Sequence, residues 1–349
     1  MASRVCFLRA LLILLAQAGL LATAAYAQSY PQQQSGQPAG QAAPQASDPE
    51  VQAAKKVQAA ADPATALQAA DEFVKKFPKS NISKNVAQIV MAKIAKLPDA
   101  NQRITFSETF QNTFKGPDYD DIIFPVLIDA YVKAERLDDA FQKTDAYLQR
   151  HPDDVVMLTQ MSLVASDQIK RRNAKYTPQA KKYGAAAAAI IEANKKPADM
   201  ADTDWAQYRT KWLAQLYVSF GTMSLIAGNE ADAQAKIQKA LTLNPTEPFS
   251  YVLLASITNN HYQALANQYK SMPPGADQDA TLKKALTEMD QLIDYYAHAV
   301  ALSENNPPYK QLHDQVLQDL QSFYKYRHKS EDGLQQLIDK YKKPAAAGQ

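Results

Sequence analysis

The sequence predicts an all-α protein from residue 48 to near its C-terminus. Apolar residues recur there at the spacing of amphipathic helices, and no stretch shows the alternation of a half-buried strand. Glycine, which weakens a helix, occurs only ten times in 349 residues. The prolines fall between the periodic runs, where they begin or end helices. We therefore expect consecutive helices joined by short turns.

The N-terminal segment, residues 1–27, has the features of a secretory signal peptide. Arg4 and Arg9 form a basic start, residues 10–21 are largely apolar, and Ala25-Tyr26-Ala27 is a small-residue cleavage site. An uncleaved membrane anchor, the alternative, would need about 20 apolar residues, more than this run offers. We expect cleavage after residue 27, export to the periplasm or another part of the cell envelope, and no integral membrane segment in the mature chain.

Composition narrows the chemistry of the mature chain. The single cysteine, Cys6, lies inside the signal segment, so disulfides, thiol catalysis and cysteine-ligated metals are excluded. A cysteine-free exported protein is more typical of a bacterial envelope than of disulfide-rich secreted domains. Removal of Arg4 and Arg9 lowers the formal net charge from +2 to 0. Neutrality argues against a general electrostatic affinity for nucleic acid or an anionic membrane, although it leaves room for a local charged patch.

Two terminal stretches lack the residues of a folded core. Residues 28–48 are rich in Gln, Pro, Ala and Gly, and Tyr30 is their only large apolar residue. Such a composition predicts a disordered linker, and a tail that binds the cell wall or a partner is the alternative. Residues 344–349 are expected to form a disordered tail. The helical domain then covers residues 49–343.

In the first half of that domain, turn residues mark the helix boundaries. Asp62-Pro63 supplies an N-cap and a first-turn proline, Lys115-Gly116-Pro117 breaks the chain, and Thr177-Pro178 starts another helix. Gly184, followed by five alanines, indicates a helix packed closely on its neighbour. The expected helices cover 66–77, 81–96, 99–114, 121–134, 137–150, 153–171 and 178–194.

The second half contains one helix pair of unusual length. The expected helices cover 205–227, 230–243, 248–270, 279–302, 308–328 and 331–342. Those over 248–270 and 279–302 should each be about 35 Å long at 1.5 Å per residue. Their excess is expected to project as a hairpin with residues 272–275 at its tip. The side chains expected to pack its two arms together are Leu265, Tyr269, Leu282, Leu286 and Met289.

The stretch from Ala214 to Pro248 carries a recognisable pattern. Two amphipathic runs flank Gly228-Asn229, with small residues where two helices would touch and large apolar residues between them. This pattern resembles the tetratricopeptide repeat, a helix-turn-helix unit of about 34 residues. Ser224 departs from the tyrosine usual at its position. The residues that match the repeat are Tyr217, Gly221, Ala233, Ile237, Ala240 and Pro245.

The resemblance covers about residues 49–343 and is most specific over 205–258. It implies a right-handed superhelical solenoid of about six antiparallel helix pairs, one of them overlong, with a concave groove lined by the first helix of each pair. That groove would bind a protein or peptide. The groove positions implied by the resemblance are Asp129, Lys133, Gln215, Val218, Thr222, Phe249, Val252, Ser256, Asn259 and Asn260.

No strong catalytic or cofactor motif occurs in the sequence. It lacks an H-E-x-x-H, a P-loop, a G-x-S-x-G and a G-x-G-x-x-G, so we expect no metal and no cofactor. Asp294 and His298 lie four residues apart, which suits two metal ligands or, more simply, a surface hydrogen bond or ion pair. A glycosidase would need two carboxylates across a cleft, and solvated helix faces are the simpler explanation of the acidic residues within helices. Those residues are Asp129, Asp167, Asp290 and Asp294.

These observations favour a non-enzymatic interaction scaffold of the bacterial cell envelope. A helical repeat module that binds glycans or other solutes is the alternative, and an all-helical glycosidase comes third. Stacked aromatic residues in the groove would favour glycan binding, and paired carboxylates would favour a glycosidase. A mixed apolar and polar strip would favour the protein-binding scaffold.

Overall fold

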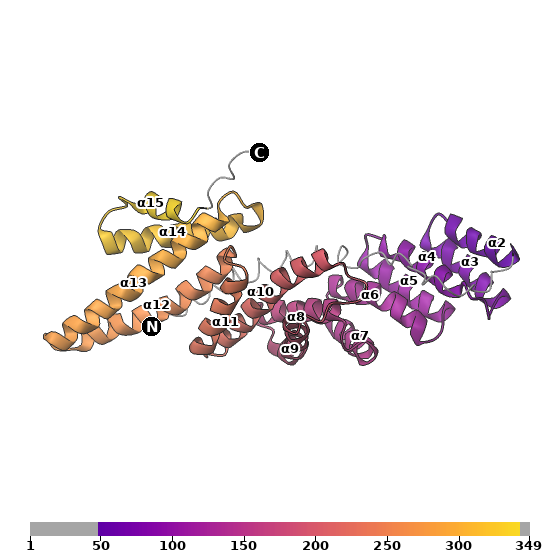
Figure 1. Cartoon of the computed structure of the whole chain (residues 1–349), viewed down its shortest axis with the longest axis horizontal. Coiled ribbons are helices and arrows are strands. Elements are labelled where there is room, and N and C mark those ends of the chain that lie inside the picture. Colours follow the sequence, from indigo (N-terminus) through magenta and orange to yellow (C-terminus); the bar gives the residue numbers. More distant parts are fainter. Residues whose placement is uncertain (1–47, 343–349) are drawn as a thin grey trace. The chain divides into compact units, whose positions relative to one another are not determined.

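The computed structural model describes residues 48–342, and these form fourteen α-helices, two short 3-10 helices and no strand (Figure 1). The all-α class predicted from the sequence is therefore confirmed. The expected signal peptide (1–27), nearly all of the linker (28–48) and the tail (344–349) lie outside the described residues. Within them, the contacts separate two compact units, residues 48–164 and 165–342.

In the first unit, each helix packs on the next one in sequence from α2 to α7. Helices α2, α3 and α4 also contact the helix after next. Large side chains such as Phe73, Phe110 and Leu127 are wholly buried in the core. The helices are α2 (Asp48–Ala59), α3 (Pro63–Lys76), α4 (Ser83–Ala95), α5 (Ala100–Thr113), α6 (Pro117–Lys133), α7 (Leu137–Arg150) and the first part of α8 (Val155–Lys170).

Side-chain caps explain several of these boundaries. Asp62 accepts a hydrogen bond of 2.9 Å from the Thr65 backbone N–H, and Asp99 accepts one of 2.7 Å from Gln102. Helix α6 begins at Pro117, earlier than the expected residue 121, and it contains Pro125, so the expectation that prolines fall only between helices is wrong there. Gly116 makes this start possible because its φ of 117° turns the chain sharply into the helix.

The second unit has a continuous apolar core shared by helices α11 to α15. Its buried residues include Ile237, Leu253, Leu292, Val316 and Ile338. The elements are η3 (Ala174–Tyr176), α9 (Thr177–Glu192), α10 (Asp202–Ile226), α11 (Glu230–Leu243), α12 (Pro248–Ser271), α13 (Ala276–Ser303), η4 (Pro307–Tyr309), α14 (Lys310–His328) and α15 (Leu334–Lys340).

Helices α10 and α11 touch at Gly221. A Cβ atom at this position would lie 2.6 Å from Ile237 Cγ1 and 3.2 Å from the backbone oxygen of Ala233, both on α11. The close approach that the small residues predict is therefore present, and glycine is the residue that permits it.

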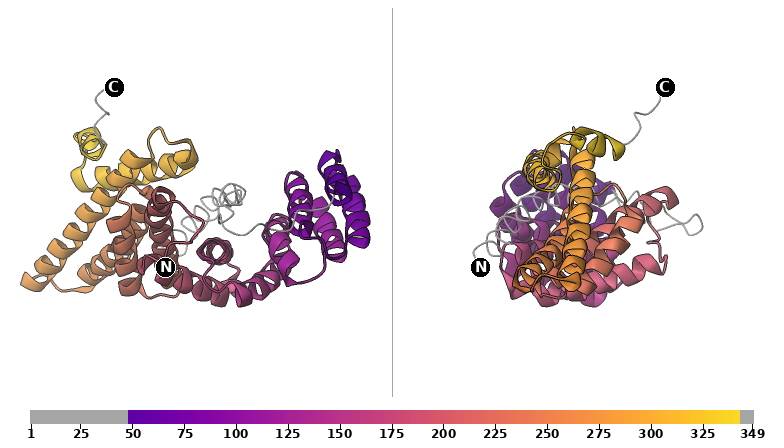
Figure 2. Two further views of the ribbon diagram at one scale, coloured as in Figure 1. Left: turned by 45° about the vertical axis from the view of Figure 1, so that its right-hand side comes forward. Right: turned by 90° about the vertical axis from the view of Figure 1, so that its left-hand side faces the viewer.

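Helices α12 and α13 contain 24 and 28 residues, so they are about 36 Å and 42 Å long. They lie side by side and run out to a shared tip (Figures 1 and 2). Burial is nearly continuous from Pro248 to Asn259, but none of residues 261–271 is buried. We call residues 261–288 the arm.

The arm is held together mainly along one seam. Met289 is buried at its base, as predicted, and the other four predicted seam residues are half-buried. At the tip, Gln278 Nε2 donates hydrogen bonds to the backbone oxygens of Tyr269 and Met272, at 3.2 and 3.1 Å. The arm thus has a closed tip, with Pro273 and Pro274 exposed on it.

Candidate functional site

The ten predicted groove residues belong to both units. Asp129 and Lys133 lie on α6 in the first unit, and the other eight lie on α10 and α12 in the second. Each group is considered within its own unit.

Asp129 takes part in a buried ion-pair cluster. Its carboxylate accepts a short hydrogen bond from the guanidinium of Arg103 on α5 and lies 2.9 Å from the ammonium of Lys133. Arg103 and Asp129 are each only 6% exposed. The contact fixes α5 against α6, and two partners already occupy the Asp129 carboxylate, so its geometry is that of a structural cluster.

On α10 and α12 the predicted groove residues differ in exposure. Gln215, Val218 and Asn260 are half-buried. The remaining five are between 2% and 6% exposed: Thr222, Phe249, Val252, Ser256 and Asn259. Of the eight predicted groove residues on α10 and α12, Gln215, Val218 and Asn260 therefore have the most surface open to solvent, and Lys133 on α6 is also exposed.

Asn260 belongs to a polar cluster at the base of the arm. Its Nδ2 donates to Glu230 Oε1 at 2.6 Å, and Glu230 Oε2 lies 3.4 Å from His261 Nε2. His261 Nδ1 also lies 3.8 Å from Glu288 Oε2 on α13. The cluster links the start of α11 to both helices of the arm. Sequence reasoning found only Asn260, because the other members come from three different helices with no shared spacing.

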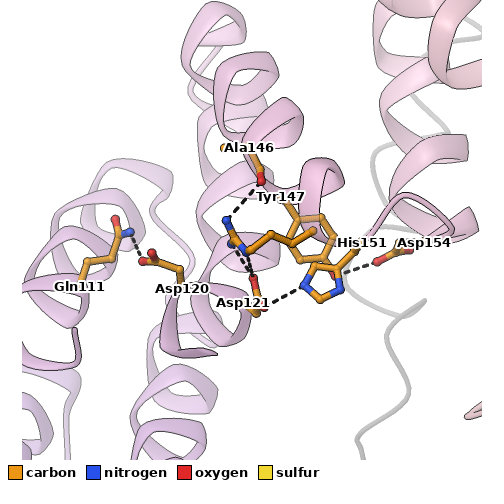
Figure 3. A network of polar contacts seen from close by, with 8 residues as sticks. Gln111, Asp120, Asp121, Ala146, Tyr147, His151 and Asp154 are labelled. Carbon is orange, nitrogen blue, oxygen red and sulfur yellow. Dashed lines mark hydrogen bonds and ion pairs between the residues drawn. The ribbon is translucent and has the colours of Figure 1, made fainter. Parts of the chain in front are cut away.

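A second polar network joins α6, α7 and the start of α8 (Figure 3). Asp121 Oδ1 accepts from Arg150 at 2.5 and 3.0 Å, and Asp121 Oδ2 lies 2.8 Å from His151 Nε2. Tyr147 donates to Asp154 at 2.8 Å, and Asp154 in turn caps α8. Burial raises the pKa of Asp121, but hydrogen bonds from Arg150 and His151 outweigh it, so that this pKa lies below its usual value.

The predicted Asp294–His298 pair is part of an aromatic stack. The His298 ring lies between the rings of Tyr251 and Tyr341, with centroids 4.5 and 3.5 Å away. Its Nε2 lies 3.9 Å from the Asp294 carboxylate, which accepts a hydrogen bond from the Tyr341 hydroxyl. Burial lowers the pKa of His298. A lowered pKa favours the neutral imidazole, so the contact is a packing and polar contact in which Tyr341, directly after α15, lies against His298 of α13.

Asp167 and Asp290, the other two acidic residues singled out within helices, each contact an arginine. Asp167 lies 2.8 Å from Arg171 Nε, and Asp290 makes two hydrogen bonds of 2.7 and 3.0 Å with Arg327. Within residues 48–342, no group of three or more acidic, histidine or cysteine side chains is arranged to hold a metal ion.

No protein-family model matches the sequence, and no curated protein sequence matches it. Within the described residues, no helix has both the length and the apolar character needed to span a membrane.

Proposed function

We propose that this chain is a non-enzymatic, protein-binding scaffold of a bacterial cell envelope. It is built as a tetratricopeptide-like, right-handed solenoid that takes a segment of a partner protein in its concave groove. Two features support the repeat architecture: each helix packs on the next from α2 to α7 and from α9 to α14, and α10 meets α11 at a glycine.

The observation that carries the functional proposal is the arm. The core covers α12 only as far as Asn259, yet both helices continue to the tip at residues 272–275. A helix pair that packs mainly on itself offers most of its other side chains to solvent. Such a projection suits contact with another protein, and its polar base lies beside the groove residue Asn260.

The groove residues with open surface fit the same interpretation. Gln215 and Asn260 offer amides, and Val218 offers an apolar side chain. A mixed polar and apolar strip suits an extended segment or a helix of another protein.

Shortening the arm tests the proposal. Deletion of Ala264–Lys284, with a short turn inserted, removes the tip and leaves the core halves of both helices. The mature chain and this variant are each used to capture partners from envelope extract, and helicity is checked by circular dichroism. Both should be folded, and the shortened chain should retain clearly less of the same partner. Equal capture would reject the arm as a binding element, and global loss of helicity would assign the segment to the core.

Two single-residue variants test whether partner capture depends on the arm itself. Lys284 on the arm and Lys239 on α11 are both exposed lysines of the second unit. Lys284→Glu should weaken capture, and Lys239→Glu should not. The same loss with both variants would mean that capture depends on overall charge.

A further inference from the structure

The second unit ends in a short segment that follows α14 after a turn of residues 329–333. We call residues 334–342 the C-terminal segment, and it consists of α15 and the two residues after it. The buried side chains of α15 are Leu334 and Ile338, which belong to the apolar core of the unit. An element near a chain end with few buried side chains opens at low free energy. The C-terminal segment is therefore suited to reversible release.

The aromatic and polar contacts of the C-terminal segment lie on and directly after α13. The centroid of the Tyr341 ring lies 3.5 Å from that of the His298 ring, and the Tyr341 hydroxyl donates to Asp294. The Lys342 ammonium lies 2.7 Å from Glu304. The three partners on the α13 side are half-buried, so they hold the segment at the surface of the unit. An aromatic face, an acceptor for a hydroxyl and a second carboxylate together fit a tyrosine followed by a lysine.

The turn before the C-terminal segment has an uncommon backbone conformation at both ends. Lys329, directly after α14, has a φ of 63°, and Gly333, directly before α15, has a φ of 87°. The left-handed conformation costs free energy for a residue with a side chain, so an extended turn would relieve Lys329. Fully extended, residues 329–333 span about 17 Å. Short turns under strain favour the exchange of the element beyond them between two copies.

We propose that two copies of this chain pair by exchanging their C-terminal segments. In the pair, Tyr341 of each copy lies on the partner's His298, and Lys342 lies beside the partner's Glu304. The segment of a second copy fits because it carries the same tyrosine and lysine at the same spacing. Each contact of the segment is remade between the copies, so the closed monomer and the pair differ in the turn and in the cost of association. This pairing does not depend on the partner-binding function proposed above.

Cross-linking between two differently tagged copies of the mature chain tests the proposal. The mature chain lacks Cys6, the only cysteine of the sequence, so each introduced thiol is unique. One copy carries Glu304→Cys and the other carries Lys342→Cys, and the mixture is treated with a short bis-maleimide. Loss of this ion pair leaves the segment attached, because partly exposed pairs contribute little. A chain with both substitutions is the reference, because it cross-links internally when the segment lies on its own α13.

The mixed copies should give a covalent dimer whose yield rises with protein concentration. In the matched control, Lys342→Cys is mixed with Lys239→Cys, an exposed position on α11, and little dimer should form. Lys329→Gly removes the penalty of the left-handed conformation and favours the closed monomer. This penalty corresponds to roughly fivefold for each turn, so the dissociation constant of the pair, measured by sedimentation, should rise roughly 25-fold. Deletion of residues 330–332 prevents closure and should make the pair the main species.

Three results would overturn the proposal. One is internal cross-linking of the double-cysteine chain with no dimer from the mixed copies at any concentration. The second is an equal yield of dimer from the Lys239 control, which would indicate unspecific contact. The third is a pair that sediments alike with and without the two changes in the turn, which would assign pairing to another surface.

Discussion

Gly221 offers the sharpest test of how the helices pack. A Cβ atom there would lie 2.6 Å from Ile237 Cγ1, whereas carbon atoms in contact are ordinarily about 3.5–4.0 Å apart. Ile237 is wholly buried, and the nearby Ala233 oxygen belongs to the backbone of α11. Any larger side chain at position 221 must therefore displace one helix from the other.

A larger side chain at position 221 changes the free energy of unfolding in two opposite ways, through overpacking and through helix propensity. Overpacking a well-packed contact costs about 1–3 kcal/mol. Replacing glycine within a helix by alanine returns about 1 kcal/mol through helix propensity. The overpacking cost less the gain in helix propensity leaves a net loss of up to about 2 kcal/mol in the free energy of unfolding for Gly221→Leu, and a smaller net loss for Gly221→Ala.

Urea unfolding followed by circular dichroism measures these changes. Ala206→Gly, at an exposed position of the same helix, should cost about 1 kcal/mol and isolates the propensity contribution. Ile237→Ala removes the obstructing Cγ1, so its combination with Gly221→Ala should show a coupling of about 0.5–3 kcal/mol. A Gly221→Ala variant that is more stable than the parent, with additive effects in the pair, would refute the close crossing.

Three further predictions concern export, burial and pH. Mass spectrometry of the exported protein should find Gln28 at its N-terminus, and retention of the leader would contradict the signal assignment. Asp129→Leu should lower the free energy of unfolding by about 3–5 kcal/mol because it leaves Arg103 buried without its partner, and the double variant Arg103→Met/Asp129→Leu should recover part of that loss in urea unfolding. The pKa of Asp121 is lower in the folded state, so its stabilising contribution is present above the unfolded carboxyl pKa of about 4 and is lost as the pH falls through the folded value. Asp121→Asn should therefore make stability depend less on pH in the acid range, and an unchanged slope would contradict this assignment.

Local features of the fold could be predicted well from the sequence. The helix over 137–150 has the expected boundaries, and Asp62 caps α3 as expected. These features depend on neighbouring residues only. The contact at Gly221 was predictable for a related reason, since small residues on two consecutive helices indicate where they meet.

Features that depend on distant residues were harder to predict. Asp129 looked like a groove residue by its place on the helix, but its partner Arg103 lies on another helix. Phe249 and Val252 were expected in the groove and are buried, because the first half of α12 is enclosed on nearly every side. Periodicity within one helix does not tell which faces other elements cover. The cluster of Glu230, Asn260 and His261 escaped prediction for the same reason.

Site-specific photo-cross-linking in the native envelope tests the scaffold function most directly. A photoreactive residue is placed in the mature chain at Gln215 in the groove, at Lys284 on the arm, or at the control position Lys239 on α11. The account predicts that the groove and arm positions yield the same discrete protein adduct and that the control position yields none. Equal labelling from all three positions, or no protein adduct from the groove and the arm, would contradict a partner-binding scaffold.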